Sequence, residues 1–360
     1  MENDTSISDL FKNIIGFGIL QGANLTIEQA RNRLDLVVNE LKDSCLLLDG
    51  SIKGRFSMHD VIRTVAITCG YTDYHVFTDK NDIESEWKDK DKLKQCTIIS
   101  LVGNKIITRL WPEGLDCPEL EFFYMRSRGS SFEIPEEFFR AMPKLKVLDL
   151  FKLQQSLLPL SLEVLTNLQT LCLDDSKIED VAIIGKLDKL KVLSMKFSNI
   201  MKLPTEIGQL TQLRILDLSN CQKLIVIAPN VISKLSQLEE LYLEGCGIQW
   251  NVEVLEELKG LSRLSGLEID IKDNKMLPKD FFFKELKRYR MSIGVWRDIR
   301  WRSYYSYYSS KYESLNMLEF DCDSTISLEE IQIVKNVEFL RLAKVSNDDN
   351  NLTTFFNEKV

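Results

Sequence analysis

The chain has 360 residues, enough for about two domains, and its 44% hydrophobic and 28% charged residues are typical of a folded protein. Its formal net charge of −8 argues against a nucleic-acid binder that works by general electrostatic attraction. The eight cysteines are scattered without a CxxC pair and no signal peptide is evident, so we expect a cytoplasmic protein without a membrane span, disulfide scaffold or zinc module.

Two helices are predicted at the start of the chain. Residues 7–20 carry apolar side chains at helical spacing, which are Ile7, Leu10, Phe11, Ile14 and Ile15. A second helix follows Thr26, because Thr26 and Gln29, three residues later, have the pattern of a capping box. This second helix mixes acidic and basic residues and has no basic stripe for reading bases, so we expect no specific nucleic-acid partner.

A hairpin and a third helix complete the N-terminal region, which we place at residues 1–78. Residues 44–48 and 55–58 flank Asp49-Gly50, a dipeptide typical of hairpin turns. Helical spacing resumes at residues 61–67. Helices followed by a two-stranded wing indicate a winged-helix-like domain, and residues 79–95 are predicted to be a linker.

An L-x-x-L-x-L pattern then recurs through residues 96–345. Successive units begin 22 to 29 residues apart, which is the spacing of leucine-rich repeats. The last two apolar positions of each unit lie two residues apart, so on a strand they point to the same face. The eleven pairs are Ile99/Leu101, Phe123/Met125, Leu148/Leu150, Leu171/Leu173, Leu193/Met195, Leu216/Leu218, Leu241/Leu243, Leu267/Ile269, Tyr289/Met291, Leu318/Phe320 and Leu340/Leu342.

This periodicity predicts an α/β solenoid of about eleven repeats with a parallel sheet on its concave side, because no unit can bury its apolar face alone. A small polar residue or cysteine after each strand is expected to bond backbone groups in the turn; these residues are Asn104, Ser176, Ser198, Cys221 and Cys246. Leu-Pro-type segments at Pro135, Pro204 and Pro229 predict short helices on the convex side. Residues 346–360 are expected to form a C-terminal tail.

The segment from Ser57 to Arg63, SMHDVIR, is similar to the M-H-D-V-x-R segment that ends the nucleotide-binding (NB-ARC) region of plant disease resistance proteins. These are the nucleotide-binding, leucine-rich-repeat (NB-LRR) immune receptors, and the resemblance is greatest to their coiled-coil class. Residues 36–48 and 98–120 resemble the same proteins, so the likeness covers nearly the whole chain. It implies a relative truncated to the end of the nucleotide-binding region plus the repeats.

In that family the histidine of this triplet faces the β-phosphate of bound ADP and helps to hold the resting state. The resemblance implies that role for His59, with Asp60 positioning it and Met58 completing the motif. The alternative is that His59 only caps or packs in the turn before the third helix. The chain has no G-x-x-x-x-G-K-[ST] loop, so we expect no cofactor in this chain alone and ADP or ATP only in full-length family members.

The partner surface is expected on the concave strands, at the positions that flank the buried pairs. Its middle is acidic, and we expect Asp217, Phe197 and Tyr242 to contact a partner, with the two aromatic rings exposed. The alternative is that such residues only keep a solenoid soluble. The acidic residues are Asp174, Asp175, Asp217, Glu240, Glu244, Glu268 and Asp270.

The unit that begins at Leu286 contains an insertion, residues 295–312, which reads VWRDIRWRSYYSYYSSKY. Tryptophan, tyrosine and arginine dominate protein-binding hot spots, because they bury a large area and also donate hydrogen bonds. We expect the insertion to bind a partner. The alternative is that neighbouring repeats cover its aromatic side chains. The residues chosen are Trp296, Arg297, Arg300, Trp301, Tyr304 and Tyr305.

No enzymatic motif stands out: the two histidines are not spaced as metal ligands, and no G-x-S-x-G elbow occurs. We therefore expect a non-catalytic immune receptor fragment that senses a pathogen effector or a modified host protein, or that contacts its own nucleotide-binding domain. The alternatives are a generic repeat adaptor such as the substrate arm of a ubiquitin ligase, a secreted or receptor-kinase ectodomain, and a non-functional fragment.

Overall fold

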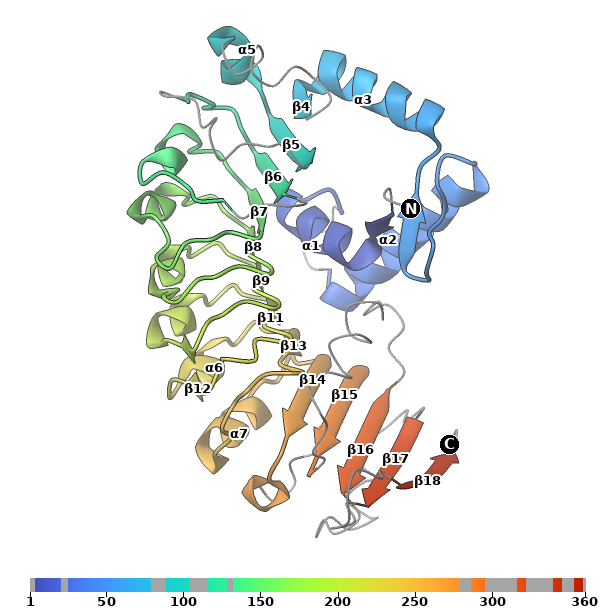
Figure 1. The fold of residues 1–360 in the computed structure, drawn as a ribbon, viewed down its shortest axis with the longest axis vertical. Helices are drawn as coiled ribbons and strands as arrows, with labels where there is room; N and C mark the ends of the chain where they lie inside the picture. The colour runs from blue at the N-terminus through green and yellow to red at the C-terminus, as the bar shows by residue number, and fades with distance from the viewer. Residues whose placement is uncertain are drawn as a thin grey trace.

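The structure is a computed structural model, and it describes residues 4–20, 25–78, 89–103, 115–127, 132–278, 281, 286–294, 316–321, 339–344 and 353–358. The repeats wind into a curved solenoid with a sheet along its inner side, and the N-terminal helices lie inside the curve (Figure 1).

Within the described residues, thirteen strands form one sheet in the order β18-β17-β16-β15-β14-β13-β11-β9-β8-β7-β6-β5-β4. Strands β4 to β17 pair in parallel, and β18 pairs antiparallel to β17. Every predicted unit contributes one strand, so the predicted solenoid is confirmed. The strands are β4 (Val76–Thr78), β5 (Ile98–Gly103), β6 (Phe122–Ser127), β7 (Val147–Phe151), β8 (Thr170–Cys172), β9 (Val192–Ser194), β11 (Ile215–Asp217), β13 (Glu240–Tyr242), β14 (Gly266–Ile271), β15 (Arg288–Ile293), β16 (Met317–Asp321), β17 (Phe339–Lys344) and β18 (Thr353–Glu358).

The apolar pairs form the core of the solenoid. Leu193, Met195, Leu216 and Leu218 are each 0% exposed, and Leu193 lies directly beside Leu216 in the parallel register. Because successive strands lie in register, each pair stacks on the next and the core is continuous along the sheet.

The turns after β8, β9, β11 and β13 are fixed by the predicted small polar side chains and cysteines. Cys221 Sγ donates to the carbonyl oxygen of Met195 at 3.0 Å, and Ser198 Oγ donates to that of Leu173 at 2.9 Å. Cys246 bonds Leu218 in the same way, at 3.1 Å. These side chains satisfy buried backbone carbonyls, so the prediction of a structural role is confirmed; Asn104 lies outside the described residues.

Short helical turns cover the convex side. They are η1 (Phe138–Ala141), η2 (Leu160–Val164), η3 (Ala182–Lys186), η4 (Thr205–Gln209), α6 (Val231–Lys234), α7 (Val252–Lys259) and η5 (Asn274–Met276). Two further strands, β10 (Lys202–Leu203) and β12 (Val226–Ile227), pair in parallel beside them. Turns follow Pro135, Pro204 and Pro229 as predicted, because proline supplies the backbone angle of a first helical turn.

Residues 4–57 form what we call the N-terminal module, and α3 (Asp60–Tyr74) follows it. The module contains β1 (Thr5–Ser6), α1 (Ile7–Phe17), α2 (Ile27–Asp43), β2 (Leu48–Asp49) and β3 (Arg55–Ser57). The three predicted helices and the hairpin are confirmed; β1 was not predicted, and it pairs antiparallel with β3. Thr26 and Gln29 form the capping box of α2, with bonds of 2.9 Å and 3.2 Å.

Helix α3 joins the module to the sheet. It ends at His75, which has a left-handed φ of 52°, and β4 follows at once and pairs with β5. The sheet thus begins before residue 79. Helix α5 (Lys90–Gln95) lies in the segment expected to be a linker, and β18 lies in the segment expected to be a tail.

Candidate functional site: the concave face

Two rows of side chains run along the concave side of the sheet, set by the register of the strands. The first row contains Val147, Thr170, Val192, Ile215, Glu240 and Arg288. The second row contains Asp149, Cys172, Ser194, Asp217, Tyr242 and Glu268. The middle of this face therefore combines β-branched apolar side chains with carboxylates.

This face is covered by α1 and α2 of the N-terminal module (Figure 1). Ile7 and Phe11 of α1 belong to one buried apolar cluster with Val192, Ile215 and Tyr242 of the solenoid. The expectation of an open concave middle is therefore wrong. The module and the solenoid share a core across this contact instead of meeting through a polar surface.

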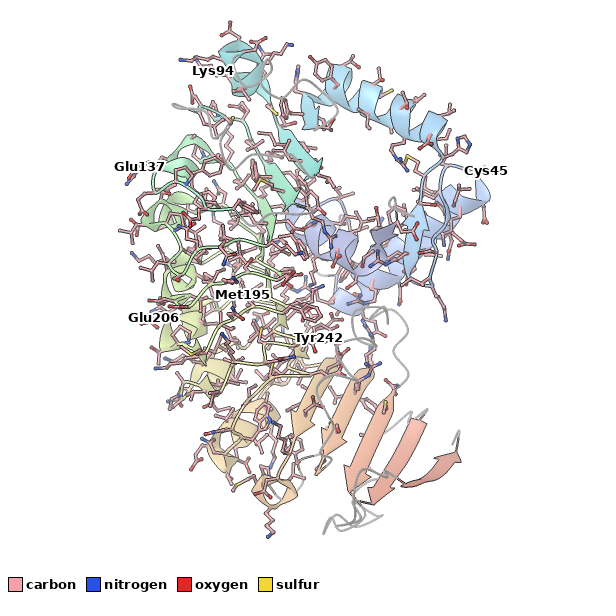
Figure 2. All side chains as sticks on the ribbon, in the orientation of Figure 1. Cys45, Lys94, Glu137, Met195, Glu206 and Tyr242 are labelled. Atoms are coloured by element: carbon pink, nitrogen blue, oxygen red, sulfur yellow. The ribbon has the colours of Figure 1, made fainter. Side chains whose placement is uncertain are left out.

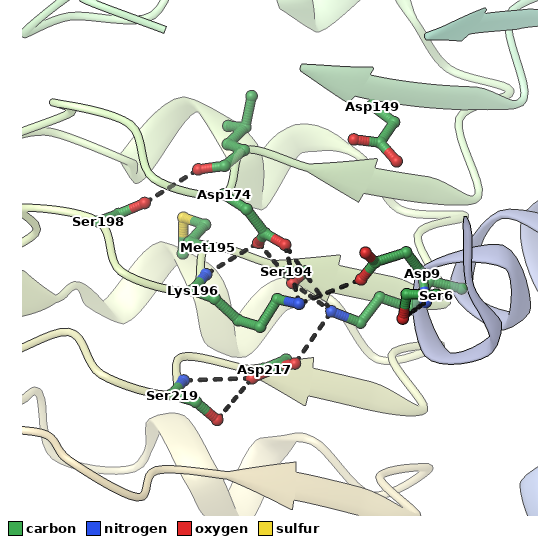
Figure 3. Close-up of polar contacts among 12 residues, drawn as sticks. Ser6, Asp9, Asp149, Asp174, Ser194, Met195, Lys196, Ser198, Asp217 and Ser219 are labelled. Atoms are coloured by element: carbon green, nitrogen blue, oxygen red, sulfur yellow. Dashed lines mark hydrogen bonds and ion pairs between the residues drawn. The ribbon is translucent and has the colours of Figure 1, made fainter. Parts of the chain in front are cut away.

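Lys12 carries the central polar contact between α1 and the sheet. Its Nζ donates to Ser194 Oγ at 2.7 Å and to Asp217 Oδ2 at 2.9 Å, and it lies 4.0 Å from an oxygen of Asp174. The side chains of Lys12 and Asp217 are 4% and 0% exposed. Asp217 is held on its other oxygen by Ser219, whose hydroxyl donates at 2.8 Å (Figure 3).

The next residues of α1 approach the sheet closely. Asn13 Nδ2 donates to Asp149 Oδ2 at 2.9 Å, and the hydroxyl of Thr170 donates to the carbonyl oxygen of Lys12 at 2.9 Å. A Cβ placed on Gly16 would lie 2.2 Å from Thr170 Oγ1, closer than side-chain atoms approach. Only glycine lets α1 sit at this distance without a shift.

Arg31 makes the matching contact from α2. Its Nη2 donates to both oxygens of Glu240, at 2.9 Å and 2.7 Å. Glu240 also accepts a hydrogen bond from the hydroxyl of Tyr242 at 2.8 Å and pairs with Arg288 at 3.1 Å. Arg31 also lies over the ring of Phe11, 4.3 Å from its centroid, which links α2 to α1.

The start of α2 is fixed by a second glutamate. The backbone N–H of Ile27, at the first position of the helix, donates to Glu239 Oε2 at 2.7 Å. A carboxylate at a helix N-terminus is favourable because the first N–H groups are free and the helix dipole is positive there. Arg214 pairs with the same glutamate and donates to the carbonyl oxygen of Leu25 at 2.6 Å.

Two ion pairs lie at the edges of the contact, where the solenoid supplies the cation. Lys196 lies 3.1 Å from Asp9 of α1, and Lys287 pairs with Glu28 of α2. Charge is therefore complementary in both directions across the contact. Since the central pairs are buried and the outer ones are more exposed, most of the specificity rests on Lys12 and Arg31.

The pKa values agree with charged pairs in the buried centre. Burial by itself lowers the pKa of Lys12, but Asp217 and Asp174 outweigh it, and the pKa is raised above its ordinary value. Burial likewise raises the pKa of Glu240, but Arg31 and Arg288 outweigh it, and the pKa is lowered. Lys12 and Glu240 thus stay ionised near neutral pH.

Asp149 behaves differently. Burial, together with Asp174 and Asp9 nearby, raises its pKa to about 7 despite the hydrogen bond from Asn13. Among the ion pairs of the described residues, none contains Asp149. Asp217, in contrast, pairs with Lys12 at 2.9 Å. Asp149 beneath α1 therefore holds its proton more tightly than an exposed aspartate does.

The residues expected to meet a partner on this face have unequal surroundings. Asp217 is buried against Lys12, and Tyr242 is 4% exposed, so the prediction that Tyr242 is exposed is wrong. In Figure 2 Tyr242 lies on the side of the sheet that faces the module, whereas Glu137 and Glu206 lie on the convex side. Phe197 is half-buried in a turn with a left-handed φ of 59°.

The insertion expected to bind a partner lies outside the described residues. This applies to Trp296, Arg297, Arg300, Trp301, Tyr304 and Tyr305. Their role stays a prediction.

The triplet that resembles the nucleotide-sensing motif lies in the turn before α3. His59 is exposed and caps the helix, since its Nδ1 accepts from the N–H of Val61 at 3.3 Å. Asp60 pairs with Arg63 at 3.0 Å, and Arg63 donates to the carbonyl oxygen of Met58 at 2.8 Å. The three residues therefore form a local brace around the start of α3, and His59 remains accessible from outside.

Sequence reasoning missed the residues of the module that hold the concave face, chiefly Lys12, Asn13, Gly16 and Arg31. A signal was present on the solenoid side. Val192 and Ile215 are apolar and β-branched at strand positions that were expected to face solvent. Apolar side chains at such positions indicate that something covers them.

The described residues contain no group of three or more histidine, cysteine, aspartate or glutamate side chains placed to hold a metal ion. No helix in the described part of the chain is long and apolar enough to cross a membrane. The geometry of the concave face is that of a protein contact, with apolar surface, buried ion pairs and an arginine whose Nη2 reaches both oxygens of Glu240.

Comparisons with known proteins agree with this architecture. The family model described as "Leucine-rich repeat region" matches residues 125–293. The Arabidopsis thaliana protein named Disease resistance protein At4g27190 is 29% identical over 289 residues, which cover 74% of this chain and 29% of that protein. Disease resistance protein RFL1 of Arabidopsis thaliana is 28% identical over 250 residues, which cover 68% of this chain and 25% of that protein. The chain thus spans less than a third of the length of these relatives.

The similar solved structures are more distant. An internalin from Listeria monocytogenes is 16% identical, with a TM-score of 0.36, over 59% of this chain and 66% of that chain. A chain of the octameric complex of Latrophilin 3, Unc5D and FLRT2 (LRR) is 15% identical, with a TM-score of 0.46, over 69% of this chain and 74% of that chain.

Proposed function

We propose that this chain, a leucine-rich-repeat protein related to plant disease resistance proteins of the NB-LRR type, acts in plant defence as a non-catalytic recognition protein. Its solenoid recognises a protein, and its N-terminal module closes the recognition face until that protein is present. The relationship to disease resistance proteins supports the defence role and a cytoplasmic location. The covered concave face supports the closure.

One observation carries this proposal: the module occupies the concave middle through two buried cations. Lys12 and Arg31 reach Asp217 and Glu240, which the sheet orients through Ser219 and Tyr242. These two contacts indicate that a segment of the same chain occupies the face, so a partner has to displace the module in order to bind there. Closed and open arrangements then form the two states that a ligand can bias.

The partner we propose is a pathogen effector or a host protein altered by one. The insertion at residues 295–312 provides a second contact in this proposal, through Trp296, Trp301 and Tyr304. Alanine at these three positions is expected to weaken binding of the recognised protein. Unchanged binding by the triple variant would remove the insertion from the proposal.

Nucleotide sensing is proposed only together with a phosphate-binding loop supplied by further protein. The exposed His59, with Asp60 and Met58 beside it, is accessible to such a domain. The chain alone is expected to bind ADP negligibly, because a single side chain gives too little contact. Calorimetry that detects micromolar binding of ADP to the chain alone would contradict this.

Cys172 offers a direct test of closure. It is 3% exposed, it lies on the concave side of β8 beside Ser194, and α1 covers this part of the face. Cys221 is 0% exposed within the solenoid core. Alkylation of Cys172 without alkylation of Cys221 therefore reports departure of the module without unfolding of the solenoid.

We expect Lys12→Glu to place a carboxylate beside Asp217, so that Cys172 is alkylated at least tenfold faster than in the wild type. The reversed pair, Lys12→Glu with Asp217→Lys, is expected to restore protection. In leaves that express the chain, ion leakage should rise with Lys12→Glu and return to the wild-type level with the reversed pair. The matched control is Lys144→Glu, at a side chain that is 54% exposed on the surface.

Equal alkylation of Cys172 in the wild type, in Lys12→Glu and in the control would contradict closure by the module. Equal leakage from all variants would contradict the defence role.

A further inference from the structure

We infer that the protein recognised by the concave face presents a cationic, amphipathic helix, with a lysine or arginine preceded by a large apolar residue and followed four positions later by glycine. This inference rests on the proposed function, since it names the class of partner for the same face. The occupant is defined by what α1 supplies to the sheet in the sequence Phe11-Lys12-x-x-x-Gly16.

The receiving carboxylate is prepared before any helix arrives. Asp217 Oδ1 accepts from the hydroxyl and from the backbone N–H of Ser219, at 2.8 Å and 3.2 Å, and both belong to the solenoid. The other oxygen, Oδ2, points to the ligand side and takes Lys12 at 2.9 Å. A carboxylate held in this way binds a cation without first losing side-chain freedom.

A second receiving group lies further along the sheet. Glu240 is fixed by the hydroxyl of Tyr242 at 2.8 Å and by Arg288 at 3.1 Å, and it takes the guanidinium of Arg31 on both oxygens. Because the solenoid holds both carboxylates in place, the face remains acidic in its centre when the module leaves. An anionic partner is disfavoured there by like charge.

Charge alone does not define the partner, because apolar side chains lie beside the two carboxylates on the same face. Val192 and Ile215 are 0% and 1% exposed under the module, in one cluster with Ile7 and Phe11. A flexible basic tail would leave them uncovered. A helix with an apolar residue next to its cation covers them as α1 does.

Close approach adds the third requirement. The hydroxyl of Thr170 donates to a backbone carbonyl of α1, and a Cβ on Gly16 would lie 2.2 Å from that hydroxyl oxygen. Residues 12 and 16 are one helical turn apart, so the cation and the glycine lie on the same face of the helix. The solenoid thus selects a helix that carries both a cation and, on the same face, a glycine that allows close approach of its backbone.

The module has an advantage over any free partner, because it is part of the same chain. A tethered segment acts at an effective concentration in the millimolar range. Binding of a free helix to the wild-type chain is therefore expected to be weak, and a variant that loosens closure exposes the intrinsic preference of the face. Lys12→Ala is suitable, because it leaves every solenoid residue of the face unchanged.

The experiment uses the full chain carrying Lys12→Ala and fluorescent peptides of residues 4–20. We expect the peptide of native sequence to bind at least tenfold more tightly than peptides with Lys12→Glu or Gly16→Ala. The alanine peptide is informative because alanine favours a helix over glycine, so weaker binding would oppose its higher helicity. Adding Asp217→Asn to the chain is expected to remove the preference for lysine over glutamate.

Alkylation of Cys172 and Cys221 in the same samples separates the outcomes. Peptides that bind with equal affinity, or no binding while Cys172 is reactive and Cys221 is protected, would overturn the inferred partner class and leave the recognition role intact. Cys172 that stays protected in Lys12→Ala would show that the cation is not what holds a helix on the face, and would overturn the inferred partner class while leaving closure by the module intact. Dimers of the chain that exclude the peptides regardless of charge would assign the face to a second copy and overturn the inference.

Discussion

Two lysine–carboxylate pairs differ in burial. An outer pair, exposed to solvent in the turns before β6 and β7, joins Lys144 to Glu119 at 2.6 Å, and their side chains are 54% and 49% exposed. On the concave side Lys12 pairs with Asp217 at 2.9 Å, and their side chains are 4% and 0% exposed. The distances within the two pairs are similar, so the effect of removing one partner depends on how much solvent reaches the pair. Water can replace either partner of the outer pair, whereas neither partner of the inner pair can be removed without leaving a buried charge.

The largest effect is expected from Lys12→Met, which removes the cation and leaves Asp217 beneath α1. Removal of one partner of a buried pair costs about 3–5 kcal/mol. We expect the loss to appear as fast alkylation of Cys172 and as a lower urea midpoint for the module. A double variant, Lys12→Met with Asp217→Leu, should recover most of the loss, because an apolar pair has no unpaired charge. An equally unstable double variant would contradict this account.

Gly16→Ala tests the close contact between α1 and Thr170 of β8 without changing any charge. The added Cβ would lie 2.2 Å from Thr170 Oγ1, so the helix or the strand has to move, at a cost of about 1–3 kcal/mol. Faster alkylation of Cys172 is the expected result. Gly18→Ala is the matched control: Gly18 has a φ of 79°, and among the described residues no atom beyond its chain neighbours lies within 4 Å of its Cβ position, so strain is expected there without opening of the face. Equal opening in both variants would show that contact with Thr170 is unimportant.

Asp149 makes closure depend on pH. Its pKa is about 7 under α1 and about 3.9 in an exposed chain, so the closed form holds the proton more tightly. A pKa raised in the closed form stabilises closure at low pH, and this stabilisation is lost as pH rises toward 7. Between pH 6 and pH 8 the loss is roughly 1 kcal/mol. Asp149→Asn should remove this part of the pH dependence and make closure firmer at pH 8, as measured by alkylation of Cys172. A variant with unchanged pH dependence would contradict the assignment to Asp149.

The smallest effect is expected from Lys144→Ala in the exposed pair. Loss of an exposed ion pair changes stability by less than about 1 kcal/mol, so the urea midpoint and the protection of Cys172 should match the wild type within error. A loss as large as that of Lys12→Met would show that burial does not distinguish the two pairs.

Periodicity predicted the solenoid because its core is built from short-range rules. Alternating apolar residues such as Leu216 and Leu218 define a strand, and the repeat places the next strand beside it. The helices of the module were predicted on similar grounds, since Thr26 and Gln29 mark the start of α2 locally.

The docking of α1 was not predicted, because amphipathic reasoning assigns charged side chains to solvent. Lys12, Asn13 and Gly16 lie away from the apolar stripe that includes Ile14 and Ile15, yet they are buried, whereas the two isoleucines are half-buried. The contact joins residues more than a hundred positions apart, such as Lys12 and Asp217. Such pairs follow from the curvature of the sheet, which no local pattern contains.

Helix α3 gives the closure a mechanical character. It is a single 15-residue rod between the module and the first strand of the sheet, and none of its described side chains is fully buried. A helix of this length spans about 22 Å. When the module leaves the concave face, α3 still connects it to β4, so the point at which the module is attached stays about 22 Å from that strand. Release is therefore a movement within one chain and not a dissociation, so the same molecule can close again once its ligand has gone.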